Sequence, residues 1–149
     1  MKFEHQIRVE APLAKVEAFF NDFETAALCL PGVEGVKELA DGMYEGKVRI
    51  KVGPLGFNIS GKARPERTAD GHWKVNGEGK DMRVAAGVKA ALEATSTAAG
   101  DDATEVKIDA DVQFSGALAG LGQPLIKKKA DAMVHEFAEN LRKAISAEA

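Results

Sequence analysis

The sequence contains a single cysteine, Cys29, among its 149 residues. An intrachain disulfide therefore cannot form, and a metal site built only from cysteines is excluded. Such sparse cysteine usage is typical of proteins from a reducing compartment. The sequence also lacks an opening signal-peptide pattern and any apolar run near the roughly 18 residues that span a bilayer. We therefore expect a soluble, cytoplasmic protein.

An excess of positive charge is also lacking. The chain has 20 Lys and Arg residues against 23 Asp and Glu residues, a net charge of −3. General nucleic-acid-binding proteins normally carry a basic excess, so nucleic acid is not an expected partner. Hydrophobic residues make up 45% of the chain, which is enough for a packed core. The length predicts one domain over residues 1–149.

Residues with catalytic or metal-binding chemistry are scarce and scattered. The three histidines, His5, His72 and His135, have no metal-ligand spacing to one another or to Cys29, so we expect no metal site. No serine lies in a nucleophile elbow. His5 and Asp81 are the two titratable candidates for an enzyme that works inside the fold. We expect a bulge over residues 77–79 to turn the Asp81 carboxylate toward solvent, because burying it would be costly.

Alternation of apolar and polar residues is the dominant pattern, and it predicts β-strands. The alternation covers residues 3–9, 44–52, 57–64, 73–80, 88–94 and 106–114. Short turns such as Gly53-Pro54-Leu55-Gly56 and Asp70-Gly71 connect successive strands. Because parallel pairing needs crossovers of a dozen or more residues, these strands should pair antiparallel.

Helices are predicted at three places. Pro12 begins a short helix, and a second runs from Phe23 to about Leu28. From Pro124 to about Ile145, apolar residues recur at helical spacing and form one stripe. A long amphipathic helix that covers one face of an antiparallel sheet defines an α+β fold.

The inward-facing positions of the predicted sheet hold unusually small residues. Of 22 such positions in five strands, eight are Gly or Ala: Gly46, Gly61, Ala63, Gly77, Gly79, Ala90, Ala94 and Ala110. Two interpretations stay open. Glycines permit the bends that curl a sheet around a filled core, as in a module that only binds a partner. Alternatively, the missing volume leaves an apolar ligand pocket.

A run of three lysines, Lys127, Lys128 and Lys129, begins the long helix beside the glycine-rich segment 116–122. Most charge runs are solvated faces. The functional alternative is contact with a partner or with anionic lipid headgroups, to which Leu118 and Leu121 would add apolar contact.

Three segments, Cys29-Leu30-Pro31-Gly32-Val33, residues 46–54 and Gly61-Lys62-Ala63, resemble the carbon monoxide dehydrogenase G-subunit family of the START-type helix-grip superfamily. The resemblance covers essentially the whole chain. It implies a curved seven-stranded antiparallel sheet wrapped around the long C-terminal helix, with two short helices after the first strand.

The same resemblance implies a non-catalytic carrier that holds a quinone or similar isoprenoid lipid. Such a carrier would serve a molybdenum CO-dehydrogenase-type enzyme at the cytoplasmic membrane and require no other cofactor. Some family members carry a hydrophobic C-terminal anchor, whereas this sequence ends directly after the helix, so we expect transient membrane contact. The alternative function is a small-molecule cyclase or dehydratase that uses the same cavity.

If the family resemblance holds, apolar side chains from strands and helices line the pocket. We expect Val48, Ile50, Phe57, Ile59, Trp73, Val75, Val88, Leu92 and Phe114 on strands, and Leu28, Leu30, Met133 and Phe137 at helices. Tyr44 and Trp73 would each offer one hydrogen bond to a ligand carbonyl. The loops 53–56 and 116–123 would frame the entrance.

Overall fold

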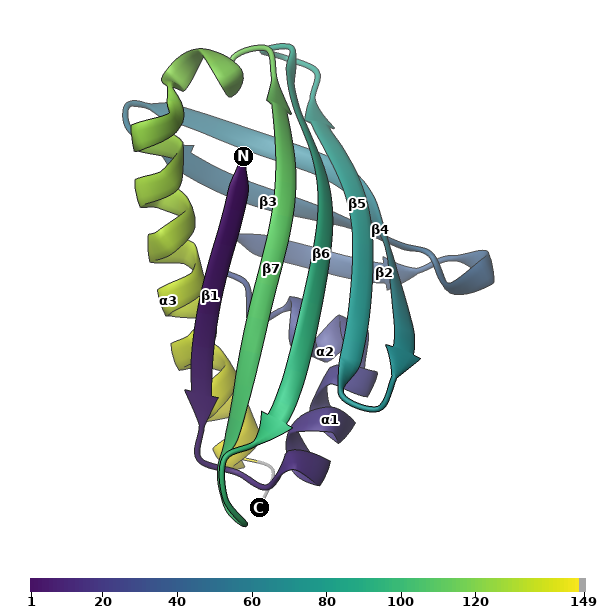
Figure 1. The fold of residues 1–149 in the computed structure, drawn as a ribbon. Coiled ribbons are helices and arrows are strands. Elements are labelled where there is room, and N and C mark those ends of the chain that lie inside the picture. The colour runs from purple at the N-terminus through teal and green to yellow at the C-terminus, as the bar shows by residue number, and fades with distance from the viewer. Residues whose placement is uncertain (148–149) are drawn as a thin grey trace.

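A seven-stranded antiparallel sheet forms most of the fold in the computed structural model, which describes residues 1–147 (Figure 1). Residues 148 and 149 of the expected domain lie outside the described residues. The sheet has the order β1-β7-β6-β5-β4-β3-β2. Its strands are β1 (Lys2–Val9), β2 (Val33–Glu38), β3 (Tyr44–Val52), β4 (Leu55–Ala69), β5 (His72–Asp81), β6 (Ala86–Ala98) and β7 (Thr104–Ser115).

Three α-helices accompany the sheet. Two short ones, α1 (Leu13–Asn21) and α2 (Phe23–Ala27), follow β1, and α3 (Gln123–Ala147) ends the described chain. Asp22 caps α2, because its carboxylate accepts a hydrogen bond from the Thr25 backbone N–H at 3.3 Å. Two 3₁₀ turns, η1 (Ala40–Gly42) and η2 (Ala119–Leu121), lie in the connections. The predicted helix-grip architecture is confirmed.

The sheet bends sharply, so that β2 and β3 run across the direction of β5, β6 and β7 (Figure 1). Gly46, Gly61 and Gly79 pair with one another across β3, β4 and β5, and we call them the glycine crease. A Cβ at Gly61 would overlap the Glu78 carbonyl oxygen, and one at Gly79 would lie 2.6 Å from the Ile59 side chain. Only glycine permits strands to approach this closely, so curvature explains these three residues.

The prediction of a bulge at residues 77–79 is wrong. β5 pairs with β6 without interruption from His72 to Asp81, and the irregularity of the β4–β5 pair lies between Arg67 and Ala69 instead. Without a bulge, the alternation of β5 continues, and Asp81 takes the inward phase.

Two separate clusters of buried side chains make up the core. The lower cluster joins β1, β7, α1, α2 and the C-terminal half of α3, and its members include Ile7, Val16, Val106, Leu141 and Ile145. The upper cluster consists of Val52, Phe57, Ile59, Ala86 and Leu118 and joins the β3–β4 turn to β6 and η2. The interior is therefore packed at its two ends.

Polar contacts fix the C-terminal half of α3 against the rest of the fold. The Asn140 side-chain amide donates to the Cys29 carbonyl at 2.9 Å, and the Arg142 guanidinium donates to the Arg8 carbonyl at 2.9 Å. Among the described residues, no helix combines the length and the apolar character needed to cross a bilayer.

Candidate ligand-binding site

Between the two clusters, the inner face of the sheet carries apolar side chains that belong to neither cluster. These side chains are only partly buried, although they point to the side on which Val106 packs against α3. They are Val48, Ala63, Trp73, Val75, Ala90, Leu92, Ala110 and Val112. Because filled protein interiors are close-packed, partial exposure of a whole inward-facing group indicates an open space in front of it. We call this part of the inner face the trough.

Strand pairing explains why this region is open. Ala63 pairs with Gly77, and Gly77 pairs with Ala90, so three small residues lie side by side across β4, β5 and β6. The glycine crease forms the adjacent cross-strand row. Small residues thus occupy two neighbouring rows where these rows cross β4 and β5.

The predicted lining residues fall into distinct groups. Val48, Trp73, Val75 and Leu92 lie in the trough, and Ile50, Val88 and Phe114 pack against the upper cluster while remaining partly exposed. Phe137 packs against the lower cluster in the same way, and Met133 and Leu30 are also half-buried.

Three predicted lining residues have other positions. Phe57 and Ile59 are only 1% and 5% exposed within the upper cluster, so they close one end of the trough and offer no open surface. Leu28 is 51% exposed at the residue that ends α2, so half of its side chain faces solvent.

Tyr44, which was predicted to donate a hydrogen bond to a ligand, contacts protein side chains instead. Its ring lies 4.8 Å from the Phe23 ring, measured between centroids, and its hydroxyl is 3.4 Å from a Glu38 carboxylate oxygen. Burial, reinforced by Glu38, raises the pKa of the Tyr44 hydroxyl. The hydroxyl therefore stays protonated and donates to Glu38. A hydrogen bond from the Trp73 indole to a ligand stays a prediction.

Asp81 is buried, contrary to the expectation that it faces solvent. Its carboxylate accepts hydrogen bonds from the Asn58 N–H at 2.8 Å, the Arg83 N–H at 3.1 Å and the Arg83 guanidinium at 2.9 Å. These partners offset the cost of burial. The Arg83 side chain, followed by the Asn58 backbone, lowers the pKa of Asp81 to about 2. A carboxylate held as an anion in this way is unsuited to proton transfer near neutral pH.

The other titratable candidates are also engaged. His5 lies on the inner face of β1, with its Nε2 atom 3.5 Å from an Asp131 carboxylate oxygen of α3. Cys29 is 6% exposed, and burial raises the pKa of its thiol, which disfavours a nucleophilic thiolate. Within residues 1–147, every buried side-chain nitrogen and oxygen has a hydrogen-bond partner, and no three His, Cys, Asp or Glu residues are grouped to hold a metal.

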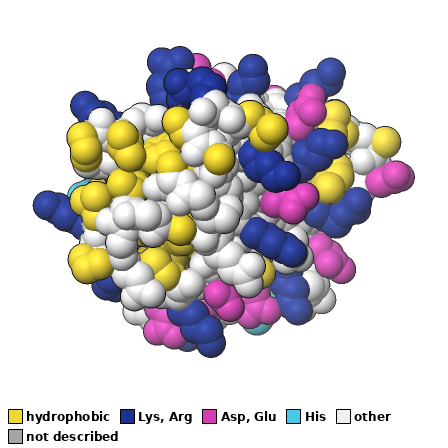
Figure 2. Space-filling model, turned by 90° about the horizontal axis from the view of Figure 1, so that it is seen from above, with side chains coloured by type: hydrophobic (Ala, Val, Ile, Leu, Met, Phe, Trp, Pro, Cys, Tyr) yellow, Lys and Arg dark blue, Asp and Glu magenta, His cyan; other side chains and the backbone are white. Residues whose placement is uncertain are grey.

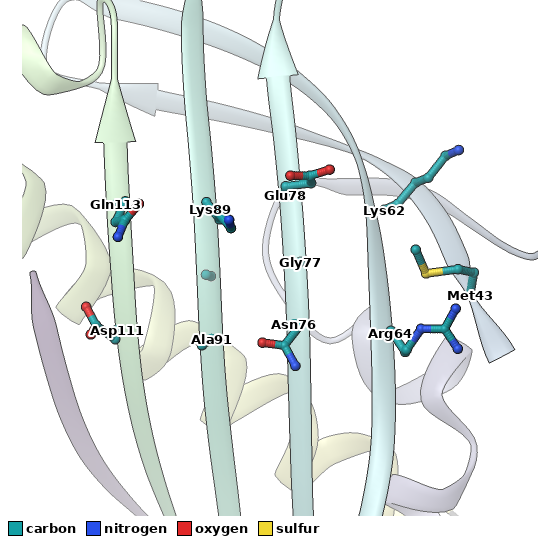
Figure 3. Close-up of a pocket in the computed structure, with 11 residues that line it drawn as sticks. Met43, Lys62, Arg64, Asn76, Gly77, Glu78, Lys89, Ala91, Asp111 and Gln113 are labelled. Carbon is teal, nitrogen blue, oxygen red and sulfur yellow. The ribbon is translucent and has the colours of Figure 1, made fainter.

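A different hollow, of about 360 Å³, lies on the outer face of the sheet (Figure 3). Figure 3 shows charged and amide side chains standing around it on β4 to β7. They include Lys62, Arg64, Asn76, Glu78, Lys89, Asp111 and Gln113. An apolar ligand needs a mostly apolar lining, so the trough is the better candidate site.

A curved seven-stranded antiparallel sheet, two short helices after its first strand and a long C-terminal helix against its inner face define a START-type helix-grip protein. Within this class, the chain belongs to the carbon monoxide dehydrogenase G-subunit (CoxG) family, whose sequence model matches residues 6–146. No curated protein matches the sequence significantly.

Solved structures agree on the fold. A conserved protein from Geobacillus kaustophilus is similar at a TM-score of 0.89 with 16% identity, covering 99% of this chain and 96% of its own. A START superfamily protein from Mycobacterium smegmatis gives a TM-score of 0.73 with 15% identity and covers 99% of both chains. The Zhui aromatase/cyclase from Streptomyces sp. R1128 gives 0.70 with 12% identity, covering 98% of this chain and 93% of its own.

Proposed function

We propose that the protein is a non-catalytic carrier that holds a quinone or similar isoprenoid lipid in the trough. The proposal includes service to a molybdenum CO-dehydrogenase-type enzyme at the inner face of the cytoplasmic membrane, with only transient contact to that membrane. The partly exposed apolar inner face between the two clusters is the observation that carries the proposal. Membership of the CoxG family supports the choice of partner enzyme.

The chemistry of the trough favours binding over catalysis. Its side chains are apolar, and an apolar guest would remove them from water at a gain of about 25 cal/mol per Å² of apolar surface. A cyclase or dehydratase would need a titratable group that faces the substrate. Asp81 is fixed as an anion, and His5 pairs with Ile108 beside the lower cluster and is not one of the trough residues.

The test uses the fluorescence of Trp73, the single tryptophan, which lies in the trough. A short-chain quinone such as decylubiquinone, which quenches nearby tryptophan, is titrated into protein that has been stripped of lipid. Ala90 pairs with the inward-phase residues Gly77 and Val112, whereas its neighbour Ala91 has the opposite phase and is exposed. Ala90→Phe and Ala91→Phe are therefore matched variants.

The proposal predicts saturable quenching of the wild-type protein. Ala90→Phe should weaken binding at least about tenfold because its ring occupies ligand volume, and Ala91→Phe should leave affinity within about twofold. Circular dichroism checks that both variants are folded. Equal affinities for the two folded variants, or no saturable quenching of the wild type, would contradict the proposal.

A further inference from the structure

One end of the molecule carries three exposed large apolar side chains. Met82 is 84% exposed, Leu55 is 43% exposed and Val84 is 41% exposed. Leu55 lies at the β3–β4 turn, and Met82 and Val84 lie in the β5–β6 loop. Both connections are at the upper end in Figure 1, together with η2 and the start of α3. We call this end, residues 53–56, 82–85 and 119–128, the apical surface.

The two leucines that the sequence predicted for contact are less available. Leu118 is 5% exposed within the upper cluster, which corrects the expectation that it touches a partner, and Leu121 is half-buried against the same cluster. Both leucines pack in or against the upper cluster, below the exposed side chains of the apical surface. The protruding apolar groups come instead from the two strand connections.

The β5–β6 loop is held in place. Asp81 accepts hydrogen bonds from Arg83, within the loop, and from the Asn58 backbone of β4, so one carboxylate ties the loop to the neighbouring strand. On the other side, the chain at Gly116 is so close to the Ala85 carbonyl that a Cβ there would overlap it. A loop fixed in this way presents Met82 and Val84 without a large loss of conformational entropy on binding.

Charge is distributed very unevenly along the molecule. The apical surface itself contains three basic residues, Arg83, Lys127 and Lys128, and no acidic one. Together with the chain that flanks it, residues 50–58, 79–88 and 113–130, this end contains six Lys and Arg residues and one acidic residue, the buried Asp81. The remaining chain contains 14 Lys and Arg residues and 22 acidic ones. A protein with a net negative charge thus has one basic end. Figure 2, which views this end from above, shows hydrophobic side chains gathered on one side, with basic side chains around them and acidic side chains toward the opposite and lower edges.

From these observations we infer that the apical surface docks on an anionic phospholipid bilayer. Met82, Val84 and Leu55 enter the boundary between headgroups and acyl chains, and Lys127 and Lys128 lie near the lipid phosphates. This inference rests on the proposed function, since a carrier of an apolar lipid must reach the bilayer that supplies it.

A bilayer fits this surface better than a protein partner does. At this end only three large apolar side chains of the described residues are exposed, and none is aromatic, whereas protein interfaces bury a centre enriched in aromatic residues. A lipid boundary accepts separate apolar side chains in any arrangement, and its phosphates attract lysines without requiring a fixed geometry.

The test measures flotation of the full-length protein with vesicles of phosphatidylcholine alone, or with about one-third phosphatidylglycerol. The apolar variant is Met82→Asp/Val84→Asp, and its control is Leu28→Asp, because Leu28 is equally apolar and 51% exposed on a different part of the molecule. The charge variant is Lys127→Gln/Lys128→Gln, with Lys37→Gln/Lys143→Gln as its control. All four of these lysines are exposed.

We expect the wild type to bind anionic vesicles more tightly than neutral ones. Each apical lysine near an anionic surface contributes about fivefold to partitioning, so the charge variant should lose about 25-fold. The apolar variant should lose at least about tenfold. The two controls should stay within about twofold of the wild type.

Two results would overturn the docking surface: no binding of the wild type to anionic vesicles, or equal losses for the apical variants and their controls. In the second case another partner, such as a protein, must cover the apical surface. Quinone titration in the absence of vesicles separates this inference from the carrier proposal. The apical variants should retain wild-type quinone affinity, and failure of that titration in the wild type would count against the carrier alone.

Discussion

Shortening Leu92 should cost far less stability than shortening Leu141, although both are inward-facing leucines. Leu141 is fully buried in the lower cluster, and Leu→Ala changes at such sites lower the free energy of unfolding by about 2–5 kcal/mol. Leu92 is partly exposed and belongs to neither cluster, so Leu92→Ala removes few contacts and creates no enclosed cavity. We expect a loss of about 1 kcal/mol or less.

Thermal and urea denaturation measure the difference in stability loss between the two variants. The protein must be free of lipid, because a bound ligand would itself raise the stability. For a domain of this length, each kcal/mol shifts the Tm by about 2–4 °C. Leu141→Ala should therefore lower the Tm by about 4–20 °C and Leu92→Ala by no more than about 4 °C. A loss of stability in Leu92→Ala as large as that in Leu141→Ala would mean that the trough is packed, and would refute the reasoning.

Two further predictions concern the crease and the buried carboxylate. Gly61→Ala should destabilise the fold by more than about 2 kcal/mol, because its Cβ would overlap the Glu78 carbonyl. Gly56 has open space around it, so the control Gly56→Ala should change the Tm little. Equal Tm values for the two variants would contradict this explanation of the bend. Asp81→Asn should lower the Tm at pH 7. The stabilisation from a lowered pKa is present above the ordinary Asp value near 4 and is lost as the pH falls to about 2. The Tm difference from the wild type should therefore shrink over that range, and a constant difference would exclude Asp81 as its source.

The alternation of apolar and polar residues was sufficient to predict the sheet, because one face of each strand is exposed to solvent. It also assigned Trp73, Val75 and Leu92 to the inner face. The ends of strands were less predictable. β4 continues to Ala69, well past the predicted residue 64, because residues 65–69 pair with β5 without offering an apolar alternation of their own.

From the sequence alone, the small inward-facing residues could either bend the sheet or leave space for a ligand. In the structure, different residues fit these two explanations. Gly61 and Gly79 are required by the close approach of neighbouring backbones, which no local pattern reveals. Ala63 and Ala90 lie beside this crease and add little volume to the trough, and Gly77 between them lies so close to β4 that a Cβ there would be 3.3 Å from the Lys62 carbonyl oxygen. Sequence composition therefore pointed to the correct region, but only strand pairing shows which residues bend the sheet and which leave space.

The features that the sequence did not predict depend on contacts between distant segments. Asp81 is buried because Asn58, 23 residues earlier in the chain, and Arg83 supply its hydrogen bonds. Met82 and Val84 stand in an apolar stretch that looks like ordinary strand sequence, and only the turn between β5 and β6 exposes them. The absence of acidic residues from 113–130 was the available signal for a basic end.

Native mass spectrometry of the protein purified from its own host, followed by solvent extraction, tests the central claim most directly. If the trough is an open apolar site, the intact protein should carry the added mass of one small molecule, and the extract should contain an isoprenoid quinone or similar lipid in about equimolar amount. Protein of unmodified mass that yields no apolar molecule on extraction, and that takes up none when quinone is added, would contradict the account.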